Sequence, residues 1–462
     1  ISTHTYPGRA TYIIGFADPN RVASILNVNF PNSVEVEFYI STTFTLLDPQ
    51  FQGSNSSAVL LQPPLDIACA NEIFTHNPNA YDPDGDSLSF ELVVPKQTAE
   101  DEVPGYLLPD QVSPGPLNSL TLNPITGTLR WSTPKVAGEY NIAIQINEWR
   151  NGVLLNSIIR DMQILVRACD NDPPTLDFTR ELCVIAGEEI NIPIIVDDPD
   201  LGDRVSLSAS GGPFQVAEDK ARLENNPGFA DPSYTANFVW QTTCNHISDR
   251  YYQVVFRAAD DAFLDATGLA TLQTLRIRVV GPPPEDLSAR SEDGGIRLSW
   301  ESPYDCEVTD NEFFQGFSVW RKTGSTALER DTCSPGLSAP YEKVIFQTRA
   351  KQDGKYSIID VGIEKGITYC YRVLAEFAQI SLTGNPYNRV ESLHSDEICQ
   401  QLSRDLPLIT KVSIDETSTT DGVVHVRWTK PLAGDLDTLE NGPPYRYELY
   451  RSLDSGDSFS II

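Results

Sequence analysis

An acidic loop follows a similar strand twice in this chain, first in YDPDGDSLSFEL (Tyr81–Leu92) and again in VDDPDLGDRVSLS (Val196–Ser208). Between the copies lies CDNDPPTL (Cys169–Leu176), a stiff acidic segment with two prolines. A loop that recurs after the same kind of strand indicates a repeated structural unit. The chain is therefore expected to be a string of β modules that meet at acidic joints.

Length and composition agree with several all-β domains. The chain has 462 residues, enough for about three to five domains of ordinary size. Val, Ile, Tyr, Phe and Thr occur in short runs that are bounded by Pro, Gly, Asn and Asp. That spacing predicts an all-β fold with many turns.

Two internal repeats divide the chain. ANEIFTHNPNAYDPDGD (70–86) parallels GEEINIPIIVDDPD (187–200), and YNIAIQINEW (140–149) parallels YYQVVFRAADD (251–261). The proline linker GPPPEDL (281–287) follows, and the motifs of the first repeat do not recur after it. A second repeat begins there, in which the strands around Trp300 recur around Trp428.

These motifs resemble known extracellular families. LNPITGTLRWSTPKVAGEY (122–140), together with the DPDGD loop, is similar to bacterial putative-Ig and cadherin-like domains. The repeats from about residue 283 resemble fibronectin type III domains, with an early-strand Trp and the late strand YCYRV (369–373). The order of the whole chain is similar to large gliding-motility-associated surface proteins of Bacteroidetes, which use type IX secretion.

The resemblance implies tandem β-sandwiches with five segments. Residues 1–62 would be the C-terminal part of an Ig-like (PKD-type) domain plus connecting strands. Residues 63–168 and 169–281 would be two cadherin-like or Ig-like domains. Residues 282–402 would be a fibronectin type III domain with an insertion, and residues 403–462 the truncated start of a second one. The chain is expected to be a piece of a longer secreted or outer-surface protein.

The charge excludes some partners. The formal net charge is −30, from 64 acidic and 34 basic residues. Such a chain repels nucleic-acid backbones and anionic membrane surfaces. No run of about 18 apolar residues is present, so direct membrane insertion is not expected in this fragment.

The acidic loops are candidate calcium sites, because calcium takes six to eight oxygen ligands. Strand directions in a seven-stranded sandwich place the loop after the second strand at the entry pole, so the joint should face the second acidic loop. This arrangement is similar to cadherin linkers, and Glu148 is a candidate for the glutamate that cadherins supply from the preceding domain. The alternative is that these residues form Asx-turns with local backbone N–H groups. The candidate ligands are Asp82, Asp84, Asp86, Asp170, Asn171, Asp172, Asp198 and Asp200.

The even number of cysteines, eight, favours disulfides and an oxidising compartment. No CxxC pair occurs, which argues against a zinc site. Expected positions at the exit poles of the sandwiches predict the pairs Cys69–Cys169 and Cys183–Cys244, and adjacent late strands predict Cys370–Cys399. Cys306–Cys333 would then close the long insertion Asp305–Tyr341. The alternative is that some of the thiols are free and buried.

No catalytic residues are expected, since none of the five histidines lies in a recognisable triad. The sequence favours a non-enzymatic structural or adhesive protein, a rod of stacked sandwiches with stiff joints that forms part of a surface stalk or filament. Its partners would be other copies of itself, other surface proteins or glycans. The alternatives are a carbohydrate-binding adhesin, for which Trp149 is the aromatic candidate, and the accessory region of a secreted hydrolase.

Overall fold

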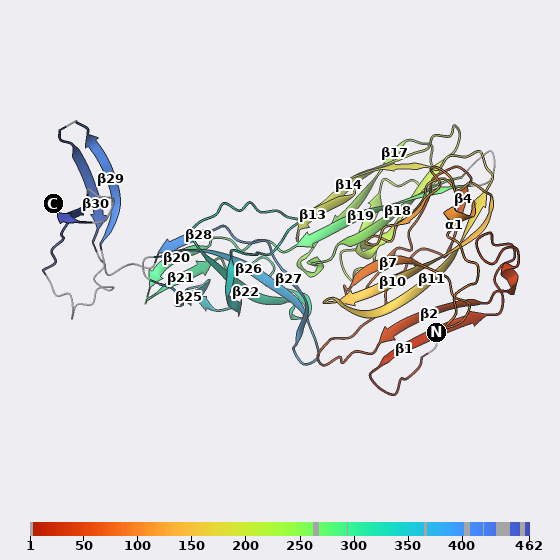
Figure 1. Cartoon of the computed structure of the whole chain (residues 1–462), viewed down its shortest axis with the longest axis horizontal. Helices are drawn as coiled ribbons and strands as arrows, with labels where there is room; N and C mark the ends of the chain where they lie inside the picture. Colours follow the sequence, from red (N-terminus) through yellow and green to blue (C-terminus); the bar gives the residue numbers. More distant parts are fainter. Residues whose placement is uncertain are drawn as a thin grey trace.

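The computed structural model describes residues 3–261, 268–292, 294–364, 367–401, 407–418, 420–430, 444–452 and 458–462. These residues form β-sheets with a few helical turns, and the all-β prediction is confirmed (Figure 1). The helical turns are α1 (Pro109–Val112), α2 (Gly212–Gln215), η1 (Ser33–Glu35), η2 (Cys244–His246) and η3 (Asp310–Glu312). Among the described residues, no helix has the length and apolar character that crossing a membrane requires.

The first module, residues 3–168, is a sandwich with a large and a small sheet. The large sheet has the order β1 (Thr11–Asp18), β2 (Phe38–Thr45), β11 (Val153–Arg167), β10 (Gly138–Arg150) and β7 (Ser87–Val93), with β4 (Leu65–Cys69) parallel to β11. The small sheet consists of β5 (Phe74–His76), β9 (Leu129–Trp131) and β8 (Leu120–Leu122), and a short pair joins β3 (Val59–Leu60) to β6 (Ala80–Tyr81). The fully buried Trp131 lies in the core between the two main sheets.

The described residues 3–62 form no separate sheet, since β2 pairs with β11 and β3 pairs with β6, both beyond the expected boundary at residue 62. The β1–β2 hairpin continues the large sheet, because β2 pairs with β11. The buried Arg21 guanidinium donates to Asp161 over 2.8 Å, and Asn27 accepts from the backbone N–H of Asn141. The N-terminal segment thus covers the second face of β10, and this strand is buried on both faces.

The second module, described over residues 169–261 and 268–281, repeats the order β4–β11–β10–β7 of the first module in one of its two sheets. One sheet has the order β12 (Thr175–Asp177), β14 (Glu189–Asp197), β17 (Tyr234–Gln241) and β16 (Arg222–Glu224); the other has β13 (Glu181–Ile185), β19 (Ala270–Val280), β18 (Tyr252–Asp260) and β15 (Val205–Gly211). Buried and exposed residues alternate strictly along β14, as expected for a strand with one core face. The parallel pair β13–β19 corresponds to β4–β11 in the first module, so the sequence repeat is a structural repeat.

The third module, residues 282–401, is a sandwich built around the fully buried Trp300. One of its sheets has the order β20 (Ser288–Glu292), β21 (Gly295–Trp300), β25 (Lys355–Asp360) and β24 (Lys351–Gln352). The other has the order β23 (Glu342–Thr348), β22 (Phe314–Thr323), β26 (Thr368–Ile380) and β27 (Pro386–Glu391), and β28 (Ile398–Gln401) also pairs with β26. The fibronectin type III assignment stays a prediction. Towards the C-terminus, β29 (Leu408–Glu416) pairs with β30 (Val423–Thr429), and β31 (Tyr450–Arg451) with β32 (Ser460–Ile461).

The three modules do not form the expected rod of end-to-end sandwiches. The first and second modules lie side by side (Figure 1), and the backbone N–H of Leu272 on β19 donates to Thr75 Oγ1 on β5 over 2.9 Å. The third module also returns to the first, since Ser381 Oγ donates to the Gln50 carbonyl over 2.7 Å. Each module therefore contacts the other two, and the three form a closed ring.

Four disulfides join the eight cysteines, and two of the expected pairs are wrong. Cys69–Cys169 and Cys370–Cys399 are present as predicted. The expected pairs Cys183–Cys244 and Cys306–Cys333 are replaced by Cys183–Cys333 and Cys244–Cys306, with Cα–Cα distances of 5.3 and 5.4 Å. Cys183 and Cys244 do lie at the pole that faces the third module, but each bonds to a cysteine of that module. Both bridges therefore cross between modules.

Peptide mapping under non-reducing conditions checks this connectivity. We expect linked peptides that contain Cys183 with Cys333 and Cys244 with Cys306, because the Cα atoms of these pairs lie within disulfide range. The Cys69–Cys169 and Cys370–Cys399 peptides serve as internal controls. Recovery of a Cys183–Cys244 peptide as the main species would contradict the arrangement.

Candidate functional site

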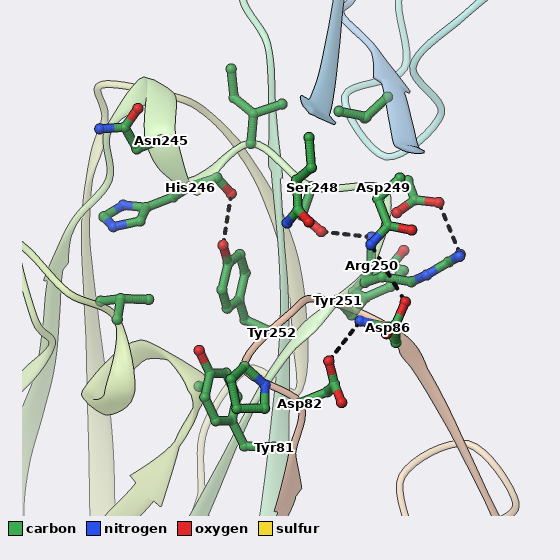
Figure 2. Close-up of a pocket in the computed structure, with 18 of the residues that line it drawn as sticks. Tyr81, Asp82, Asp86, Asn245, His246, Ser248, Asp249, Arg250, Tyr251 and Tyr252 are labelled. Atoms are coloured by element: carbon green, nitrogen blue, oxygen red, sulfur yellow. Dashed lines mark hydrogen bonds and ion pairs between the residues drawn. The ribbon is translucent and has the colours of Figure 1, made fainter. Parts of the chain in front are cut away.

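The first acidic loop bends back around the carboxylate of Asp82, directly after β6. Asp82 Oδ1 accepts from the backbone N–H of Asp84 over 3.0 Å. It also accepts from the backbone N–H of Asp86 over 2.9 Å (Figure 2). Gly85 has a φ of +77°, a conformation that glycine adopts without a steric penalty. The Asx-turn alternative is thus correct for one oxygen of Asp82. The other oxygen, Oδ2, is buried and has no hydrogen-bond partner.

Three carboxylates gather behind this loop. Ligand oxygens of Asp82, Asp86 and Glu148 all lie within 4.8 Å of one another. The residues are 6%, 5% and 1% exposed, so none of the three is solvated like a surface carboxylate. Glu148 comes from β10, which pairs with β7 directly after the loop. Asp84 is not part of this cluster, because its carboxylate accepts from the backbone N–H of Ser56 instead.

One buried guanidinium lies against the cluster. Arg150 donates to both oxygens of Asp86, over 2.8 Å from Nε and 2.6 Å from Nη2. Its remaining N–H groups bind the carbonyls of Gln52 and Ser54 and the side-chain oxygen of Asn55. Burial raises the pKa of Asp82 to about 8 and also raises the pKa of Glu148. The cluster thus places three carboxyl groups beside one arginine.

The second acidic loop meets the joint as expected. The backbone N–H of Asp172 donates to Asp200 Oδ2 over 2.7 Å, which confirms that the joint faces the loop. Asp198, Asp200 and Asp203 place ligand oxygens within 4.8 Å of one another. Burial raises the pKa of Asp198 to about 6. The exposed Asp170 lies outside this cluster.

Two further acidic residues at the joint, Asp260 and Glu72, were not among the candidates predicted from the sequence. Asn171 donates to Asp260 over 3.3 Å, and burial raises the pKa of Asp260 to about 6. Burial and the neighbouring Asp172 raise the pKa of Glu72. Glu72, from the first module, therefore occupies the place for which Glu148 was expected. The sequence signal that could have identified Glu72 was its position directly before a predicted strand, in NEIFTH of the first copy.

A cavity of about 840 Å³ lies where the three modules meet. Asp82 and Asp86 line it from the first module, and residues 245–253 form a wall from the second module (Figure 2). The third module contributes residues around Gln379 and Tyr387. The acidic loop of the first module therefore lines a cavity that all three modules share.

Trp149, the aromatic candidate for sugar binding, is not an exposed platform. Its side chain is partly buried, and Nε1 donates to Ser89 Oγ over 2.9 Å. The tryptophan belongs to β10, where it pairs across the sheet with Ser87 of β7. This residue packs against its own sheet.

Replacing Arg150 with alanine should destabilise the first module by about 3–5 kcal/mol, because the buried Asp86 would lose its ion-pair partner. The measurement is calorimetric unfolding in the presence of chelator, so that no divalent cation replaces the arginine. Arg222→Ala is the matched control. Its ion pair with Glu224 is exposed on both sides, 53% and 45%, and we expect less than about 1 kcal/mol there. Equal effects of the two substitutions would contradict the role of Arg150.

Comparison with known proteins gives only distant likenesses. No protein-family model and no curated protein matches the sequence. Among solved structures, the I-band fragment I67–I69 from titin is 10% identical, with a TM-score of 0.22, and the match covers 76% of this chain and 99% of that chain. The human desmocollin-1 ectodomain is 13% identical, with a TM-score of 0.19 over 92% and 78%. Tandem Ig repeats of Dlar are 9% identical, with a TM-score of 0.21 over 48% and 98%. At these TM-scores the likenesses carry no argument beyond what the sheets show.

Proposed function

We propose that this chain is part of an extracellular, non-enzymatic structural or adhesive protein, in which three sandwiches act as one stiff body within a longer surface stalk or filament. The observation that carries the proposal is the pair of disulfides between the second and third modules. Disulfides are typical of secreted and surface proteins. Two covalent links between neighbouring modules resist both bending and separation at their junction.

Origin and partners belong to the same proposal. The order of modules supports a gliding-motility-associated surface protein of Bacteroidetes that is exported by type IX secretion. A second copy of the chain is the partner we favour, since β1 is an edge strand and exposes Ile13, Ile14 and Phe16. A glycan, another surface protein or a hydrolase domain elsewhere in the protein are the alternatives. The full open reading frame separates the hydrolase alternative from the surface fibre.

Calcium at the joint is a further part of the proposal. The acidic side chains of Asp198, Asp200 and Asp203, together with the nearby Glu72, supply the hard oxygen ligands that calcium prefers. A bound ion would fasten the linker to the second module. This site would stiffen the passage from the first module to the second.

Single-molecule pulling on the chain ends tests the mechanical role. The Cys183–Cys333 bridge spans 150 residues and encloses the Cys244–Cys306 bridge, which spans 62. Breaking the outer bridge with Cys183→Ser and Cys333→Ser should release 150 minus 62, or 88, further residues, an added extension of about 300 Å. Cys244→Ser with Cys306→Ser is the control and should add nothing while the outer bridge holds. Equal extensions in both variants would exclude the proposed reinforcement.

Calorimetry with calcium and with chelator tests the joint. We expect calcium to raise the unfolding temperature of the wild type, since binding at 100 times Kd stabilises the folded state by about 2.7 kcal/mol. Asp198→Asn with Asp200→Asn should reduce this increase, whereas Asp353→Asn, an exposed loop residue, should leave it unchanged. An equal calcium-induced rise in unfolding temperature in all three proteins would exclude calcium binding at the joint.

A further inference from the structure

The cluster behind the first acidic loop carries an unbalanced charge. Asp82, Asp86 and Glu148 are together three negative charges when ionised, and Arg150 supplies one positive charge against them. With all three carboxyl groups ionised, a remainder of minus two would be buried, and an uncompensated buried charge is strongly unfavourable. One divalent cation would neutralise that remainder.

One carboxylate oxygen of this cluster is free to bind such a divalent cation. Asp82 is 6% exposed, and its Oδ2 has no partner, although its other oxygen accepts two backbone N–H groups. Ligand oxygens of Asp86 and Glu148 lie within 4.8 Å. The shared cavity provides a path for an ion, because Asp82 and Asp86 both line it.

The third module closes over this loop. Asn388 Nδ2 donates to the Asp84 carbonyl over 3.2 Å, and Gln379 Nε2 donates to the same carbonyl over 3.1 Å. The Asn388 Oδ1 atom is buried and has no partner. The ring of Tyr387 lies 5.0 Å from the guanidinium carbon of Arg150. Each of the two modules thus has one buried, unpartnered oxygen on a residue that belongs to this loop or contacts it.

We propose that Asp82, Asp86 and Glu148 bind one calcium ion between the first and third modules, that Asn388 supports the ion from the third module, and that the ion holds the ring closed. This inference deepens the calcium part of the proposed function but concerns a different site from the joint. The ligand set consists of carboxylate and amide oxygens, the donors that hard cations take, and lacks the sulfur and imidazole donors that favour zinc.

Titration with calcium chloride after chelator treatment tests the site. Asp82→Asn should bind one ion fewer per chain than the wild type. Asn388→Ala should bind the same number, with about tenfold weaker affinity at one site, as is usual when a supporting group is lost. Asp200→Asn changes only the joint, so a failure of the joint site and a failure of this site give different results.

Hydrogen exchange supplies the readout for ring closure. In the wild type and in Asp200→Asn, calcium should slow amide exchange in residues 379–388, whereas Asp82→Asn should show no such response. Should Asp82→Asn fail to fold, the partly exposed Asn388 still permits the test through its alanine variant, whose response should require about tenfold more calcium. Equal stoichiometry in Asp82→Asn and the wild type, or calcium-independent exchange of residues 379–388 in the wild type, would overturn the proposal.

Discussion

The junction between the second and third modules determines the rest of the arrangement. Two disulfides, Cys183–Cys333 and Cys244–Cys306, cross it. Ile247 of the second module is 3% exposed because it is buried in the core of the third, in the cluster that contains Trp300. Two covalent links and a shared core leave the third module little freedom to rotate. Its β26–β27 hairpin is therefore held over the first module.

The first acidic loop lies at the contact between the first and third modules. Asp82 and Asp86 line the cavity there, and Asn388 and Gln379 of the third module bind the Asp84 carbonyl of the same loop. Under the third module they are 6% and 5% exposed, beside Glu148 and a single arginine. The same kind of loop at the joint remains partly open, since Asp198 and Asp200 are only partly buried. Two copies of one motif thus have different electrostatics because their surroundings differ.

Much of the local structure was predictable from the residues. Short apolar runs between turn residues and the recurring acidic loops indicated strands and modules, and β4–β11–β10–β7 of the first copy has the same order as β13–β19–β18–β15 of the second. The contact between the joint and Asp200 followed from strand direction alone. The disulfides show the limit of this reasoning. Cys183 and Cys244 were placed at the correct pole, but spacing cannot tell a partner within a module from one in the next module.

The all-β class, the repeated sandwiches and the position of each acidic loop after its strand follow from the residues alone, because short apolar runs and turn residues act over a few neighbouring residues. The ring of modules, the presence of Glu148 and not Asp84 beside Asp82 and Asp86, and the contact of Asn388 with their loop depend on tertiary packing. Asn388 lies 302 residues from Asp86 in the chain. Such contacts depend on how whole modules pack, and local sequence patterns do not predict that packing.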